Sequence, residues 1–160
     1  MTSPSLDPPN VVILQRSPSR RYLPIASSIC STLESSHSIP CTVLSIEPST
    51  PLSLVAAALA STTVLVGVHG AGFSHSLLLP SDSSVIEITL RGSDLWPPPD
   101  SYYHKGDYHN LALSLGLRYS VIDARAVTRG RGTKEISVRD VLVDVGEVVE
   151  EVACRFREYG

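Results

Sequence analysis

The feature that most constrains the fold of this chain is a regular alternation of short, β-branched apolar runs with segments typical of helices. The run TVLVGV at Thr63–Val68 is apolar on both faces, which is the pattern of a buried central strand in a parallel sheet. Four similar runs also predict strands, at Val11–Arg16, Cys41–Ile46, Ser84–Leu90 and Arg118–Ala124.

The segments between these runs have the composition and spacing of helices. Predicted helices lie between Pro24 and Pro40, and at Leu52–Ala60, Phe73–Leu79, Tyr108–Leu115 and Val138–Arg157, the last after a polar loop at Ala126–Glu135. Strands that alternate with helices predict an α/β fold: a single Rossmann-like domain whose parallel sheet is covered by helices on both faces.

Length and composition agree with one domain. The chain has 160 residues, of which 42% are apolar and 18% charged, and this excludes a disordered chain. A net charge of −3 gives no basic excess, so we expect no nucleic-acid partner. The polar, Pro-rich segment 1–10 predicts a disordered tail before a domain at 11–160. We expect no targeting segment and no membrane segment, because the longest apolar run, Leu52–Val68, is too short and carries Ser and Thr.

Three cysteines are present: Cys30, Cys41 and Cys154. They form no C-x-x-C pair and no cluster with histidine at metal-ligand spacing, so we predict no metal site. An odd number of cysteines does not make a disulfide framework. We therefore expect buried or half-buried free thiols, which say little about the compartment of the protein.

A glycine turn, His69-Gly70-Ala71-Gly72, follows the predicted central strand and precedes a helix. Ligands of open parallel sheets bind beyond the carboxyl ends of the strands. Glycines there let backbone N–H groups approach a ligand, and the helix start favours an anion such as a phosphate. In the alternative interpretation, the glycines only permit close packing and His69 is an ordinary turn histidine.

Charged residues follow or end other strands of the predicted sheet. Arg16, Arg20 and Arg21 come at or after the end of the first strand, and guanidinium groups suit a diphosphate. They could equally form a solvated edge. Glu87 lies within the fourth strand, where an ionised carboxylate needs a partner, and it could accept hydrogen bonds from ribose hydroxyls.

Two other motifs are excluded. The glycine turn is similar to the oxyanion-hole loop of lipase-type hydrolases, but no G-x-S-x-G nucleophile motif follows it. The nicotinamide fingerprint G-x-G-x-x-G lacks its third glycine, because His75 stands there.

Four strings of this sequence resemble the C-terminal half of glycosyltransferase family 61: Ile13–Arg21, Val64–Pro80, Val85–Ile88 and Tyr108–Tyr119. This resemblance covers roughly Val11 to Tyr119 and implies the donor-binding half of a GT-B enzyme. Such an enzyme is inverting and metal-independent, and it transfers a sugar from a nucleotide sugar, usually a UDP-sugar, to a glycan or glycoprotein acceptor. No cofactor is implied.

By matching motif positions, the resemblance implies that the arginines Arg16, Arg20 and Arg21 and the turn His69–Gly72 hold the donor diphosphate, with Glu87 near the nucleoside. It also implies a Golgi or ER lumen location and an N-terminal acceptor domain that these residues do not include. The catalytic base is not identified. The alternative is a non-catalytic nucleotide- or anion-binding module, or a fragment without turnover.

Overall fold

The computed structural model describes residues 10–16, 21–89, 107–128 and 139–158. Its main element is a five-stranded sheet with the order β3-β1-β4-β5-β6, in which every neighbouring pair is parallel. The strands are β1 (Asn10–Arg16), β3 (Cys41–Ile46), β4 (Thr62–Val68), β5 (Ser84–Thr89) and β6 (Arg118–Asp123). The α/β fold class predicted from the sequence is confirmed, and β4 is the central strand, buried at every position.

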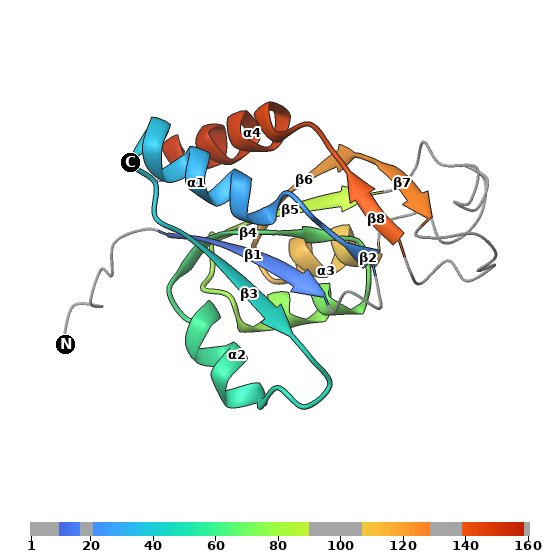
Figure 1. The fold of residues 1–160 in the computed structure, drawn as a ribbon. Helices are drawn as coiled ribbons and strands as arrows, with labels where there is room; N and C mark the ends of the chain where they lie inside the picture. The colour runs from blue at the N-terminus through green and yellow to red at the C-terminus, as the bar shows by residue number, and fades with distance from the viewer. Residues whose placement is uncertain (1–9, 17–20, 90–106, 129–138, 159–160) are drawn as a thin grey trace.

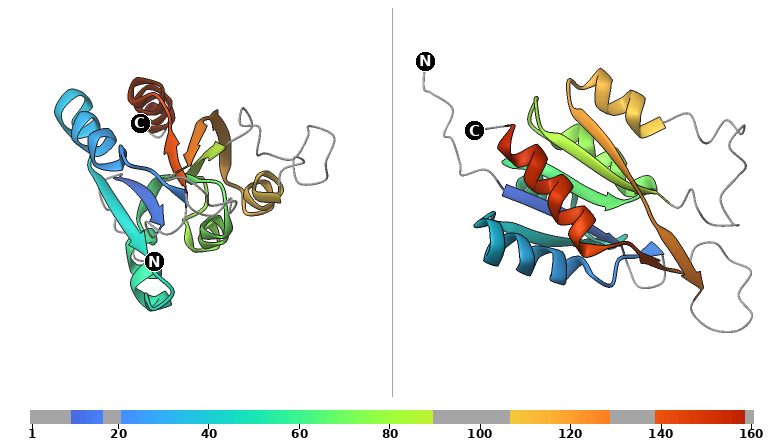
Figure 2. Two further views of the ribbon diagram at one scale, coloured as in Figure 1. Left: turned by 45° about the vertical axis from the view of Figure 1, so that its right-hand side comes forward. Right: turned by 90° about the horizontal axis from the view of Figure 1, so that it is seen from above.

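Two helices, α1 (Ala26–His37) and α4 (Val145–Arg157), lie side by side on one face of this sheet (Figures 1 and 2). Their apolar stripes are fully buried in one large cluster with the sheet, as Leu33 of α1 and Val152 of α4 illustrate. The spacing of these residues at three and four positions is what turns one side of each helix toward the sheet.

Three helical segments pack on the opposite face: α2 (Leu52–Leu59), the 3₁₀ helix η1 (Ala71–Leu78) and α3 (Asp107–Ser114) (Figure 2). Val55 and Leu59 of α2 pack with apolar residues of β1 and β4 in one cluster. The ring of Phe73 in η1 is buried in a second cluster with Ala112 of α3. Helices therefore cover both faces of the sheet, as the sequence predicts.

A second, three-stranded sheet corrects two predictions. It has the order β2-β8-β7 and consists of β2 (Arg21–Tyr22), β8 (Arg139–Leu142) and β7 (Arg125–Thr128) (Figure 1). The predicted helix from Val138 is wrong over Arg139–Leu142, and the predicted polar loop is wrong over its first residues. The cause is the antiparallel pairing of β7 with β8, which offers β-branched residues a ladder that spacing within one segment does not reveal.

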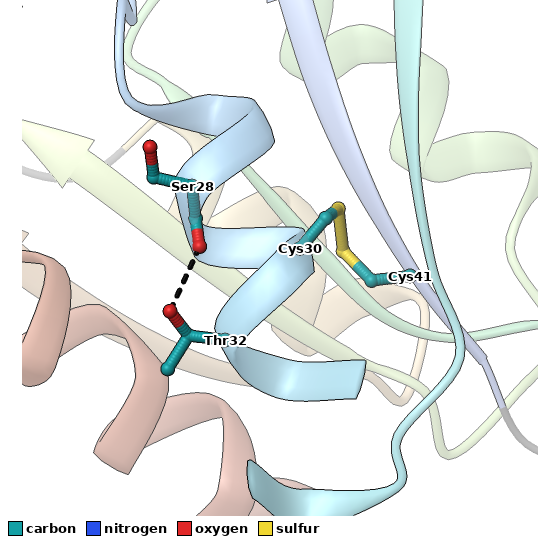
Figure 3. The surroundings of a disulfide bond; sticks show 4 residues. All are labelled: Ser28, Cys30, Thr32 and Cys41. Carbon is teal, nitrogen blue, oxygen red and sulfur yellow. Dashed lines mark hydrogen bonds between the residues drawn. A yellow bond between two sulfur atoms is a disulfide. The ribbon is translucent and has the colours of Figure 1, made fainter. Parts of the chain in front are cut away.

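A disulfide joins Cys30 of α1 to Cys41, the first residue of β3 (Figure 3). The expectation of free thiols is wrong for this pair. The short connection between helix and strand brings the two Cα atoms within 5.0 Å, a separation that a disulfide can span. Cys154 is a free thiol, but it is exposed rather than buried.

Candidate functional site

The order of the strands places a topological switch point between β1 and β4. From β1 the chain crosses to β3 on one side, and it then returns past β1 to β4 on the other side. The chain after β1 leads to β3, and the chain after β4 leads to β5 on the opposite side, so a crevice opens beyond the carboxyl ends of β1 and β4. Open α/β sheets bind their ligands in this crevice.

A cavity of about 690 Å³ lies at this place. Its walls come from the end of β1, the segment after β3, helix α2 and the start of η1: Leu14, Gln15, Arg16, Ile46, Glu47, Pro48, Thr50, Leu52, Val55, Ala71, Gly72 and His75. Its volume falls within the range of small-molecule binding sites. The cavity is therefore a candidate binding site formed by segments that are distant in the sequence.

Two parts of the predicted diphosphate site meet in this cavity. Arg16, the last residue of β1, lines it together with Ala71 and Gly72, the first residues of η1. A residue that carries a guanidinium group and the first residues of a helix thus line one volume. Both favour an anion, and phosphate oxygens suit both.

Backbone conformation explains the glycine at position 70 of the turn, whereas close packing does not explain the glycine at position 72. Gly70 has φ 147° and ψ −179°, a conformation that residues with a Cβ atom rarely adopt. A Cβ atom on Gly72 would meet no atom within 4 Å, so close packing does not require glycine there. Close packing instead explains Gly67 in β4, where a Cβ atom would lie 3.2 Å from that of Leu14.

His69 and Glu87 form a separate network beside the glycine turn. The backbone N–H of His69 donates to the Ile88 carbonyl at 2.9 Å, which continues the pairing of β4 with β5. Glu87 is only 3% exposed, and its carboxylate accepts hydrogen bonds from Nδ1 of His69 and from the hydroxyl of Tyr119. The His69 ring also meets the ring of Tyr108 edge-on, at 5.4 Å between centroids. Glu87 thus has the partner that its burial requires.

The other predicted arginines are placed differently. Arg20 lies outside the described residues. Arg21 is in β2, in the small sheet, and β2 contacts β1. Gln15 of β1 holds the segment after β2, because its side-chain amide donates to the Leu23 carbonyl at 3.0 Å and accepts from the Leu23 N–H at 3.3 Å. The backbone of Arg21 is therefore kept near the end of β1. The role of Arg21 in binding a diphosphate stays a prediction.

No family model matches this chain. The chain is similar to the alpha-1,3-arabinosyltransferase XAT2 of Oryza sativa subsp. japonica, with 28% identity over 111 residues. The aligned segment is 69% of this chain but 18% of that protein. The chain therefore spans less than one fifth of the length of this relative, and the similarity concerns a segment about the size of one domain.

The structure adds residues that the sequence analysis did not select. Glu47 and Thr50 follow β3 and line the cavity, and Tyr119 of β6 completes the network around Glu87. The rule that ligands bind beyond the carboxyl ends of strands would have found Glu47, because it comes directly after a predicted strand. Nothing in the sequence pattern pairs Tyr119 with Glu87.

Two further findings concern the described parts of the chain. Within them, no group of three or more His, Cys, Asp or Glu side chains is placed to hold a metal ion. None of the helices found there has the length and apolar character needed to cross a membrane.

Proposed function

We propose that this chain is the donor-binding domain of a glycosyltransferase related to family 61 and of the GT-B type. It would bind a nucleotide sugar, most simply a UDP-sugar, whose sugar passes to a glycan or glycoprotein acceptor with inversion and without a metal ion. The similarity to an arabinosyltransferase supports the general class. The observation that carries the proposal is the shared cavity of Arg16, Ala71 and Gly72 at the switch point of the sheet.

In this proposal, the diphosphate lies between the Arg16 guanidinium and the N–H groups at the start of η1. Negative charge develops on the departing nucleoside diphosphate during glycosyl transfer. Cations and N–H dipoles that are already fixed around it lower the energy of the transition state. Arg20 and Arg21 would add positive charge from the segment after β1, and His69 would add a donor beside the turn.

The acceptor side of the reaction is proposed to come from outside these residues. A GT-B enzyme uses two Rossmann-like halves, and the second half would supply the acceptor contacts and the catalytic base. We place the protein in the Golgi or ER lumen. The Cys30–Cys41 disulfide supports that placement, because disulfides persist in oxidising compartments.

The test is calorimetric titration with UDP of the wild type and of two arginine variants. Arg16→Ala removes the charge that lines the cavity and is expected to weaken UDP binding by at least about tenfold. Arg157→Ala is the matched control, because Arg157 is exposed near the end of α4 and does not line the cavity. Equal affinity of the wild type and Arg16→Ala would count against the site.

The alternative function is a nucleotide-binding module without catalysis. UDP binding would support both functions equally, so turnover has to separate them. Release of the sugar from a UDP-sugar, or its transfer to an acceptor, supports the enzyme. Binding without either reaction, also when the chain is part of a longer protein, supports the module.

A further inference from the structure

The cavity contains a carboxylate at the end opposite to the glycine turn. Glu47 directly follows β3, its side chain is exposed, and it is the acidic residue among the described residues that line the cavity. Arg16, at the end of the neighbouring strand β1, and the glycine turn after β4 account for an anion on the β1–β4 side of the cavity. A carboxylate repels the anion itself, but it can accept hydrogen bonds from neutral hydroxyls of the same ligand.

The turn that carries Glu47 is fixed by two hydrogen bonds. The Glu47 N–H donates to the Thr50 hydroxyl at 2.9 Å, and the Thr50 N–H donates to the Glu47 carbonyl at 2.9 Å. Pro48 and Pro51 restrict the backbone of the same segment. The turn therefore holds the backbone of Glu47 in one position at the wall of the cavity.

The spacing of the strands fits a nucleotide that lies across them. β3, β1 and β4 are neighbours, so the ends of β3 and β4 are about 10 Å apart. A diphosphate held between β1 and β4 would carry its ribose one strand further, toward β3. Acidic residues at the end of a neighbouring strand accept hydrogen bonds from ribose hydroxyls in other Rossmann-like domains.

Glu87, for which the sequence pattern predicts this role, is placed less well for it. Both of its carboxylate oxygens already accept hydrogen bonds, from His69 and from Tyr119. Glu87 is also not among the residues that line the cavity. Glu47, by contrast, is exposed and lines the cavity.

We infer that Glu47 recognises the ribose hydroxyls of the nucleotide and makes the site selective for ribonucleotides, an inference that rests on the proposed donor site. The test compares three ligands by calorimetry: UDP, 2′,3′-dideoxy-UDP and inorganic pyrophosphate. The proteins are the wild type, Glu47→Ala and Arg16→Ala. Glu34→Ala is the matched control, because Glu34 is exposed on α1 and does not line the cavity.

The wild type and Glu34→Ala are expected to bind UDP at least about tenfold more tightly than the dideoxy nucleotide, as hydrogen bonds to a charged group predict. In Glu47→Ala this ratio is expected to fall below about threefold, while pyrophosphate binds as tightly as before or more tightly. Thermal unfolding of the variants without ligand checks that the fold is unchanged.

Two results would overturn the inference, and they are distinguishable. If pyrophosphate binds to the wild type and weakens in Arg16→Ala, but Glu47→Ala keeps the preference for UDP, the donor site stands and Glu47 does not recognise the ribose. If the wild type binds neither UDP nor pyrophosphate, the proposed function fails, and the role of Glu47 fails with it.

Discussion

Among single residues, Glu87 is a buried carboxylate whose hydrogen-bond partners indicate its role. Its carboxylate accepts one hydrogen bond on each oxygen, so the Tyr119 hydroxyl and the Nδ1–H of His69 are both donors. The bond at Nδ1 fixes the orientation of the His69 ring, and any contact from the ring to a ligand would pass through Nε2. Glu87 thus orients the side chain of His69, which follows the end of β4.

The two glycines of the turn allow a prediction at the same scale. Gly70→Ala forces a Cβ atom into a strained backbone conformation and is expected to lower the free energy of unfolding by about 1–3 kcal/mol. Gly72→Ala is the control, because its Cβ atom would enter open space. Urea denaturation of both variants measures the difference. Equal stability of the two would show that the φ angle of Gly70 imposes no strain.

Part of the site could be predicted from the sequence, because ligands bind beyond the carboxyl ends of parallel strands. Arg16 and the glycine turn both follow apolar runs that are recognisable as strands, so the carboxyl-end rule selects them. The partners of a side chain are harder to predict, because they depend on the register between strands. The pairing of Glu87 with Val121 in β6 brings the nearby Tyr119 to the carboxylate, and the sequence alone does not contain this register.

At the scale of elements, the five main strands could be predicted because each is a compact apolar run between turn residues. The boundary between β8 and α4 could not be predicted in this way. Val141, Leu142 and Val145 have a spacing that fits a helix, but the first two belong to β8, whose partner β7 is separated from it by ten residues outside the described ranges. Pairing with another segment decided between helix and strand.

Asp144 marks the true start of α4 and gives a prediction for this element. Its backbone is extended, and its Oδ1 accepts a hydrogen bond from the Glu147 N–H at 3.0 Å. Asp144→Ala removes this cap and is expected to lower the free energy of unfolding by about 1 kcal/mol in urea denaturation. Asp144→Asn keeps an acceptor and should retain most of the stability. If both variants unfold alike, the cap does not stabilise the helix.

At the scale of the whole molecule, the candidate site depends on the order of the strands more than on any one segment. Arg16 at the end of β1, Glu47 after β3 and Gly72 at the start of η1 are well separated in the sequence. They meet because β1 lies between β3 and β4. The wall of the cavity on the β3 side therefore depends on how firmly β3 is held against the rest of the domain.

The Cys30–Cys41 disulfide is one of the features that hold this edge strand, and it supplies the last prediction. It closes a loop between residues separated by 11 positions, and its loss is expected to lower the free energy of unfolding by about 3 kcal/mol. The variant Cys30→Ser/Cys41→Ser, compared with the wild type by urea denaturation, measures this loss. Wild-type protein in a reducing buffer should approach the stability of the double variant.

The exposed Cys154 provides the control for that experiment, because Cys154→Ser removes a thiol without opening a loop. Its stability should match that of the wild type, and it should still respond to the reductant. If the reductant changes neither protein, and the double variant is as stable as the wild type, then the bond does not stabilise the β3 edge.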